Sequence, residues 1–342
     1  MASACNKRTR GGAILALWVA LAPGAVGAKE PAALVEVTID STYDGTPQPA
    51  VMFLPEKTDG PVPLLVCLHS WSANYRQRGQ VEAARAECVK RGWAMIHPNF
   101  RGPNLRPEAC ASPAAKQDVL DAVEFIRKKM DVDPRRIYLV GSSGGGHMAL
   151  VMAAHAPELW AGVSAWVPIT DLAAWHAESR RRGNRYAGML ERVCGGAPGD
   201  SPEVDEQYRM RSSLPFLAAA KGLAIDINAG IHDGHTGSVP VSHTLRAFGA
   251  LAAANSQPEK QLTDGQIAAM VKDRRVPAEL AGERVDEPGR KHPVLFRREA
   301  GPARVTIFDG GHAGDVPTAI RWLAEHRRAS PPATRANENP QR

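Results

Sequence analysis

Apolar, β-branched runs alternate with helix-like stretches through most of the sequence, and this alternation constrains the fold more than any other feature. A strand that continues through a helix into a neighbouring strand gives a parallel pair, and a parallel sheet is covered by helices on both faces. The sequence therefore predicts an α/β fold with a mostly parallel central sheet. The predicted strands and helices in this part of the chain are 63–69 (strand), 78–91 (helix), 93–100 (strand), 112–130 (helix), 135–140 (strand), 145–156 (helix) and 161–169 (strand).

Outside this region the pattern changes. Two strands at 34–39 and 50–55 flank a turn-rich stretch and are predicted to pair antiparallel. Residues 171–215 are polar and rich in Arg and Gly, which predicts an inserted cap or lid at one edge of the sheet. The alternation then resumes with segments that follow in chain order: a strand at 223–231, a helix at 240–254, a polar segment at 255–292, a strand at 303–308 and a helix at 315–328.

The two ends of the chain do not fit the folded domain. Basic residues precede an apolar stretch within residues 1–28, which end in small residues, and this layout is typical of a secretory signal peptide. We therefore expect a periplasmic or secreted protein with one catalytic domain at 29–330 and a disordered tail at 331–342. No later stretch approaches the length of a transmembrane helix.

Charge gives little support for a nucleic-acid partner. The formal net charge is +6, and removal of residues 1–28, which hold three cations and no anion, lowers it to +3. The remaining basic patch at 179–185 lacks interleaved aromatic residues and is interpreted as a solvated loop.

Four cysteines follow the predicted signal peptide. Cys67 and Cys88 lie in a predicted strand and helix and are expected to be buried thiols, whereas Cys110 and Cys194 lie in loop-like contexts. Because an exported protein meets oxidising conditions, Cys110 and Cys194 are the better candidates for one disulfide.

The glycine cluster 141–146, with two serines inside it, lies between a predicted strand and a predicted helix. It lacks the lysine of a phosphate-binding loop. Gly144, Gly146 and Ala149 match a dinucleotide fingerprint, but two strand and helix units precede them, and the end of the next strand carries Val167, Pro168 and Ile169 instead of the expected acidic residue. The frame G-x-S-x-G fits best, and it places Ser143 at the nucleophile of a sharp strand-to-helix turn.

A serine nucleophile needs a histidine base and a carboxylate, in the chain order Ser, Asp or Glu, His for this kind of turn. His312 follows a late strand through two glycines and is the predicted base. Asp233 follows the strand at 223–231 and is the predicted carboxylate, with Asp171 as the alternative. His232 and His235 flank Asp233, so a metal pair is a second interpretation of that loop, beside a polar active-site loop.

Further site residues follow from these positions. The backbone amides of Trp71 and Gly144 are predicted to form the oxyanion hole. Trp166 and Trp175 fall near the expected active-site edge and are candidates for contacting a sugar ring. Arg101, in the loop after its strand, is a candidate for meeting a substrate carboxylate or for bracing that loop.

These pieces together resemble the α/β-hydrolase fold, and more narrowly the catalytic domain of the prolyl oligopeptidase family and related secreted carbohydrate esterases of the acetylxylan type. The motifs that carry the resemblance are "LHSWS", "NFRG" at 99–102, "GSSGGG" around Ser143, "AGIHD" at Asp233 and "GGH" at His312. Two features depart from the family. Three extra residues lie between Asp233 and Val239, and the first predicted strand follows the signal peptide where the peptidases have a β-propeller.

The resemblance and the triad together predict an exported serine hydrolase that cleaves a carboxylic ester, on a small molecule or a carbohydrate, without a metal or organic cofactor. The alternative is a serine peptidase that acts on short peptides or aminoacyl amides with the same triad. A non-catalytic binding protein on this fold is a third interpretation, which the apparent triad disfavours.

Overall fold

The computed structural model describes residues 1, 2, 33–56 and 58–329. The predicted signal peptide, beyond its first two residues, and the predicted tail at 331–342 lie outside the described residues and stay predictions.

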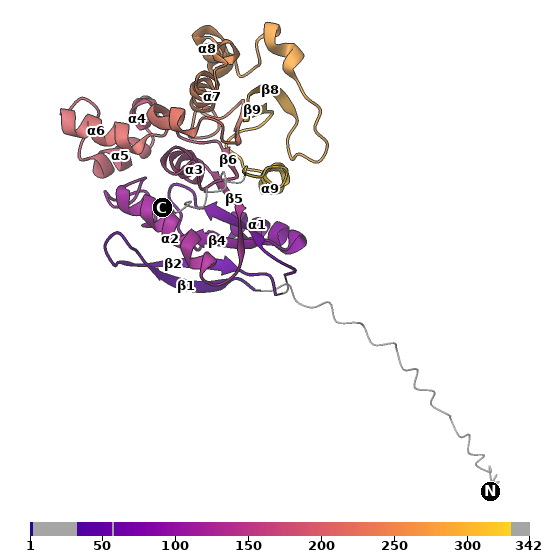
Figure 1. Cartoon of the computed structure of the whole chain (residues 1–342). Coiled ribbons are helices and arrows are strands. Elements are labelled where there is room, and N and C mark those ends of the chain that lie inside the picture. The colour runs from indigo at the N-terminus through magenta and orange to yellow at the C-terminus, as the bar shows by residue number, and fades with distance from the viewer. Residues whose placement is uncertain (3–32, 57, 330–342) are drawn as a thin grey trace, which may run out of the picture. The chain divides into compact units, whose positions relative to one another are not determined.

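A mixed sheet forms the centre of the domain, and nine strands are found in the described part of the chain (Figure 1). They are β1 (Val35–Asp40), β2 (Pro47–Phe53), β3 (Val62–Leu68), β4 (Ala94–Pro98), β5 (Val132–Ser142), β6 (Gly162–Trp166), β7 (Ile225–Gly230), β8 (Val294–Ala300) and β9 (Ala303–Phe308). Their order across the sheet is β1-β2-β4-β3-β5-β6-β7-β9-β8. The strands from β4 to β9 in this order are parallel to their neighbours, whereas β1, β2 and β8 pair antiparallel. The mostly parallel sheet predicted from the sequence is therefore confirmed.

Each central strand contributes to two hydrophobic cores, because successive side chains point to opposite faces of a sheet. In β3, Leu64 and Val66 pack into one core, and Leu65 and Cys67 pack into the other. All seven residues of β3 are buried, as its continuous apolar sequence predicts for a strand covered on both sides.

Helices cover both faces. One core is closed by α2 (Pro113–Arg127) and α3 (Gly144–His155), and the other by α1 (Arg78–Arg91) and α9 (Val316–Leu323). The helix α7 (Ser242–Ala254) contributes to both cores. The loops at the carboxyl ends of the parallel strands carry the residues of the candidate site.

Three short helices lie between β6 and β7. They are α4 (Leu172–Arg181), α5 (Tyr186–Cys194) and α6 (Pro202–Arg211), and they group together beside α3 in Figure 1. They pack on a separate apolar cluster that includes Trp71, Trp175 and Tyr208. The structure thus gives this polar stretch a helical form with its own small core.

A second insertion separates α7 from β9. It holds α8 (Asp264–Asp273), three-residue and six-residue 3-10 helices at Pro258–Lys260 and Ala278–Glu283, and the edge strand β8. The sequence prediction left this region as a polar segment and missed β8. In β8 the buried positions Val294 and Phe296 flank the partly buried Leu295, and two arginines and a glutamate then precede the buried Ala300, so its hydrophobic alternation is short and weak.

The disulfide expected between Cys110 and Cys194 is wrong, because all four described cysteines are free thiols. Both residues are buried in the apolar cluster under the three inserted helices and do not lie in exposed loops. Burial raises the pKa of the Cys194 thiol to about 12, so this thiol stays protonated and unreactive at neutral pH.

Among the described residues, no helix combines the length and the apolar character that crossing a membrane requires.

Candidate active site

Ser143 occupies a strained turn between β5 and α3. Its backbone has φ 60° and ψ −119°, a conformation that side-chain-bearing residues rarely adopt. The Ser143 amide donates to the Trp166 carbonyl at 2.8 Å, which ties the turn to β6. A Cβ on Gly141 would lie 2.3 Å from the Gly145 carbonyl oxygen, so this close approach requires glycine. The turn has the geometry of a nucleophile elbow.

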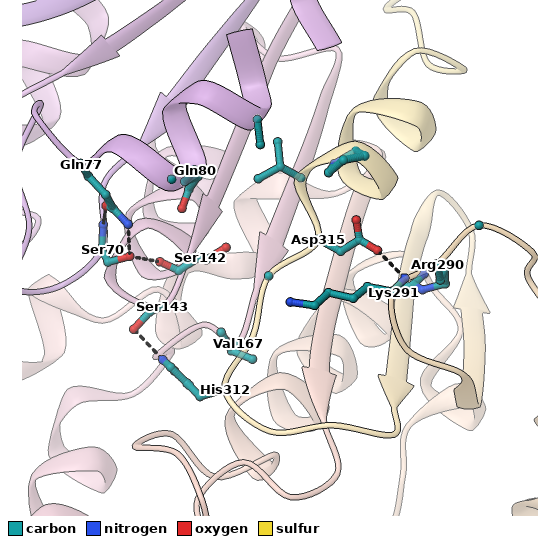
Figure 2. A pocket seen from close by; sticks show the side chains of 16 residues that line it. Ser70, Gln77, Gln80, Ser142, Ser143, Val167, Arg290, Lys291, His312 and Asp315 are labelled. Carbon is teal, nitrogen blue, oxygen red and sulfur yellow. Dashed lines mark hydrogen bonds between the residues drawn. The ribbon is translucent and has the colours of Figure 1, made fainter. Parts of the chain in front are cut away.

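His312 lies between Ser143 and Asp233 and hydrogen-bonds to both. Its Nε2 lies 2.9 Å from the Ser143 Oγ, and its Nδ1 lies 2.7 Å from an Asp233 carboxylate oxygen. Figure 2 shows the Ser143 and His312 side chains pointing toward each other at one end of a pocket. The three residues come from loops after β5, β7 and β9, which are far apart in the sequence and meet at one edge of the sheet. The structure therefore brings together the three side chains that the sequence assigned to the triad.

The Asp233 carboxylate is held in place by backbone donors. Its other oxygen accepts hydrogen bonds from the amides of Gly234 at 2.8 Å and Val239 at 3.2 Å, and the residue is 2% exposed. The three extra residues in this loop thus fold so that Val239 reaches back to Asp233. The departure from the family motif leaves the carboxylate in contact with His312.

The alternative residues have other partners. Asp171 caps the N-terminus of α4 by accepting from the Ala174 amide at 3.0 Å. His232 lies 3.2 Å from Asp309, and the His235 ring contacts the Val271 carbonyl. Across the described ranges, no group of three or more His, Cys, Asp and Glu side chains is placed to hold a metal ion.

The predicted oxyanion amides lie next to each other. A Cβ on Gly144 would lie 2.3 Å from the Trp71 backbone nitrogen, so the two backbones are in close contact. In the part of the chain that the structure describes, neither amide donates to a protein acceptor. The Trp71 ring is buried against Trp175, with ring centroids 4.7 Å apart, and this packing fixes the backbone of Trp71.

A pocket of about 670 Å³ opens beside Ser143 and His312 (Figure 2). One wall comes from polar side chains of the loop after β3 and of α1, including Ser70, Gln77 and Gln80. The opposite wall comes from the loop before β8 and the start of α9, including Arg290, Lys291 and Asp315. Polar and charged side chains therefore stand on both walls of the pocket, among apolar lining residues such as Val167 and Val316.

The structure does not bring the three predicted substrate-contact side chains to this pocket surface. Trp166 and Trp175 are 2% and 1% exposed, because their rings pack into the domain. Arg101 is buried, and its guanidinium forms ion pairs with Asp118 at 2.8 Å and Asp44 at 2.8 Å. Arg101 braces the loop after β4, and no face of it is open to a substrate.

Two pocket residues were missed by the sequence analysis. Arg290 and Lys291 lie in the second insertion, which was interpreted only as a polar segment. The signal available in the sequence was the adjacent pair of cations after Gly289, but nothing local indicates that this loop folds back onto the catalytic edge of the sheet.

The sheet order, the strained serine turn and the hydrogen-bonded Ser, His and Asp side chains define a protein with the α/β-hydrolase fold. A family model described as BD-FAE, an esterase-type hydrolase domain, matches residues 51–190, a range that includes Ser143 and ends before Asp233. No curated protein matches the sequence significantly.

Solved structures with the same fold include several peptidases. The Pyrococcus horikoshii acylaminoacyl peptidase superposes with a TM-score of 0.53 at 18% identity, and the match covers 66% of this chain and 36% of the peptidase. Oligopeptidase B from Leishmania major gives a TM-score of 0.55 at 12% identity, covering 86% of this chain and 35% of its own. A puromycin-hydrolyzing peptidase of Mycobacterium tuberculosis gives a TM-score of 0.55 at 17% identity, and the match covers 85% of this chain and 38% of the peptidase.

The chain thus spans little more than a third of the length of these peptidases. At these identities the solved structures show the fold, whereas the family model and the hydrogen-bonded Ser, His and Asp side chains indicate a serine hydrolase.

Proposed function

We propose that the protein hydrolyses carboxylic esters by acyl transfer through Ser143, His312 and Asp233. The observation that carries this proposal is the position of His312, which is within hydrogen-bond distance of the Ser143 hydroxyl and of the Asp233 carboxylate at once. This is the arrangement that a neutral serine requires to become a nucleophile.

In the proposed mechanism the Ser143 Oγ attacks the ester carbonyl carbon while His312 Nε2 accepts the hydroxyl proton. The carbonyl oxygen gains negative charge and is stabilised by the amides of Trp71 and Gly144, whose hydrogens are not used elsewhere in the described structure. His312 then donates its proton to the leaving alcohol, and an acyl-enzyme remains. A water molecule, deprotonated by His312, attacks the acyl carbon. The bond to the Ser143 Oγ then breaks, His312 returns the proton to that oxygen, and the acid leaves.

Asp233 acts on His312. Its carboxylate accepts a hydrogen bond from the Nδ1–H group, which keeps the proton on Nδ1 and leaves Nε2 unprotonated and directed at Ser143. It also stabilises the imidazolium that forms during each proton transfer.

The ester assignment rests on the esterase-type family model that covers the nucleophile. The tryptophans that suggested a sugar substrate are buried, so no aromatic platform for a carbohydrate supports that narrower assignment. A peptidase is the second candidate, and the peptidases among the structural neighbours favour it.

A comparison of matched ester and amide substrates tests the choice. We expect the purified protein to turn over ethyl esters with a kcat/KM well above that for primary amides and aminoacyl anilides with the same acyl group. Ethyl esters are used because they lack the activated leaving group of aryl esters, which esterases and peptidases alike can hydrolyse. The Ser143→Ala variant supplies the background rate, and a faster turnover of the amides would contradict the ester assignment.

A further inference from the structure

The loop of residues 284–293 forms the wall of the pocket that faces the catalytic end. It belongs to the insertion between α7 and β9, and it leads into the edge strand β8. Pairing of β8 with β9 holds this loop near His312, which follows β9 directly. The insertion thus contributes side chains to the pocket without contributing to the triad.

Cations outnumber anions beneath this wall. Glu287 is shared by three guanidinium groups, with Arg290 at 3.1 Å, Arg321 at 3.5 Å and Arg297 also in direct contact. Burial opposes the ionisation of Glu287, but the hydrogen bonds and charges of Arg297 and Arg290 outweigh it and lower its pKa to about 2. Asp226, the other carboxylate that acts on Arg290, is paired with Arg304 at 2.8 Å, so two carboxylates face four guanidinium groups here.

Arg290 is fixed by its surroundings and does not move freely into the pocket. Its side chain is 2% exposed, it donates to the Asn228 side chain at 2.7 Å, and it lies over the Trp166 ring at 5.1 Å. It contributes a fixed positive field at the pocket floor, where screening by water is weak.

Asp315, an acid that lines the pocket, already accepts hydrogen bonds from neighbouring residues. Asp315 caps α9 by accepting from the Thr318 amide and hydroxyl, and it also accepts from the Lys291 backbone amide at 3.0 Å. The three donors occupy both carboxylate oxygens. These donors are neutral, so Asp315 keeps its negative charge at the pocket wall. It holds the Lys291 backbone amide and, within the described residues, forms no ion pair with the Lys291 ammonium.

The Lys291 side chain extends from this loop into the pocket on the side of Val167 (Figure 2). Within the described ranges, its ammonium forms no ion pair and no hydrogen bond to another residue. An unpaired cation on a fixed backbone, beside the nucleophile and above a wall with excess positive charge, is the arrangement that binds an anion.

We propose that Lys291 binds a negatively charged group, a carboxylate in the simplest case, that the substrate carries near its scissile ester bond. The substrate class is therefore an anionic ester. This inference rests on the proposed ester hydrolysis, and it concerns which esters the site prefers.

Two matched pairs of esters test the proposal, one with the charge on the acyl group and one with the charge on the alcohol. The first pair is mono(4-nitrophenyl) succinate and 4-nitrophenyl butyrate, which share a leaving group and a four-carbon acyl chain. The second pair is 4-acetoxybenzoate and its methyl ester. The readout is the ratio of kcat/KM for the anionic ester to that for the neutral ester.

We expect the wild type to prefer the anionic member of at least one pair, and Lys291→Gln to lower that ratio about tenfold, as expected for loss of one charge-assisted contact. Lys291→Glu is expected to lower it further. Addition of about 0.5 M salt is expected to lower the wild-type ratio, because exposed charges are screened. Lys272→Gln, at an exposed position of α8 away from the pocket, is the matched control and is expected to leave the ratio unchanged.

The outcomes separate the two proposals. The anion site is overturned if the neutral esters are hydrolysed but neither Lys291 variant changes the ratio of kcat/KM for the anionic to the neutral ester in either pair. The esterase proposal then stays intact. Failure of the wild type to hydrolyse any of the four esters overturns the esterase proposal, and the anion site with it.

Discussion

Replacing Ser143 by alanine is expected to lower kcat for ester hydrolysis about 10⁴-fold or more, because the variant has no atom that can form the acyl-enzyme. The fold should persist. The side chain becomes smaller, and the strained turn is held by the backbone hydrogen bond from residue 143 to Trp166. Initial rates with a chromogenic ester, together with a thermal unfolding curve, measure both effects.

Ser142→Ala is the matched control for this variant. Ser142 is the neighbouring residue in the sequence and also lines the pocket, but the hydrogen bond of His312 Nε2 goes to the Ser143 hydroxyl. Its replacement is expected to change kcat by less than about tenfold, since no step of the mechanism requires its hydroxyl. Equal losses in the two variants would contradict the assignment of Ser143 as the nucleophile.

The Asp233→Asn substitution is expected to lower kcat by about 10⁴-fold with little change in structure. The amides of Gly234 and Val239 donate to one side-chain oxygen of residue 233, so the asparagine carbonyl is held there. The asparagine NH₂ group then faces His312 Nδ1, which must be unprotonated to accept from it. The proton moves to Nε2, and Nε2 can no longer accept the proton of Ser143.

Asp171→Asn is the control for this substitution, since Asp171 is the other carboxylate that the chain order allows. Asn and Asp are similarly good N-caps, so α4 should keep its start and the activity should stay near that of the wild type. A large loss of kcat in Asp171→Asn with a small loss in Asp233→Asn would reverse the assignment. The comparison uses kcat/KM at one pH, with circular dichroism to show that both variants are folded.

The central sheet and the triad were predictable because their signals are local. The continuous apolar sequence of β3 indicates burial on both faces, and the G-x-S-x-G frame distinguishes Ser143 from Ser142. Chain order then limits the carboxylate and the base to a few residues. The roles of these residues remain predictions that the variants above test.

The substrate side of the site was not predictable in the same way. Arg101 is neutralised by Asp44 and Asp118, which are 57 and 17 residues away in the sequence, and no local pattern reports such pairs. Trp166 lies in a predicted strand and Trp175 in the predicted cap, and the sequence does not say whether either ring faces the core or the pocket. The structure buries Trp166 in one core of the sheet and Trp175 in the apolar cluster of the inserted helices.

The pocket wall was missed for a related reason. Its position depends on β8, whose arginines obscure the alternation of Val294 and Phe296, and on the pairing of β8 with β9. Lys291 is adjacent in space to the catalytic end because of that long-range pairing. From sequence alone it is one cation in a polar stretch.

The most direct test of the account is the identity of the residue that a fluorophosphonate probe modifies. Such probes form a covalent bond with a serine that an adjacent base activates. The account predicts stoichiometric labelling of the wild type, mapped by peptide mass spectrometry to Ser143, and no labelling of Ser143→Ala. Absence of labelling in the folded wild type, or labelling that persists in Ser143→Ala, would contradict the claim that Ser143 is an activated nucleophile.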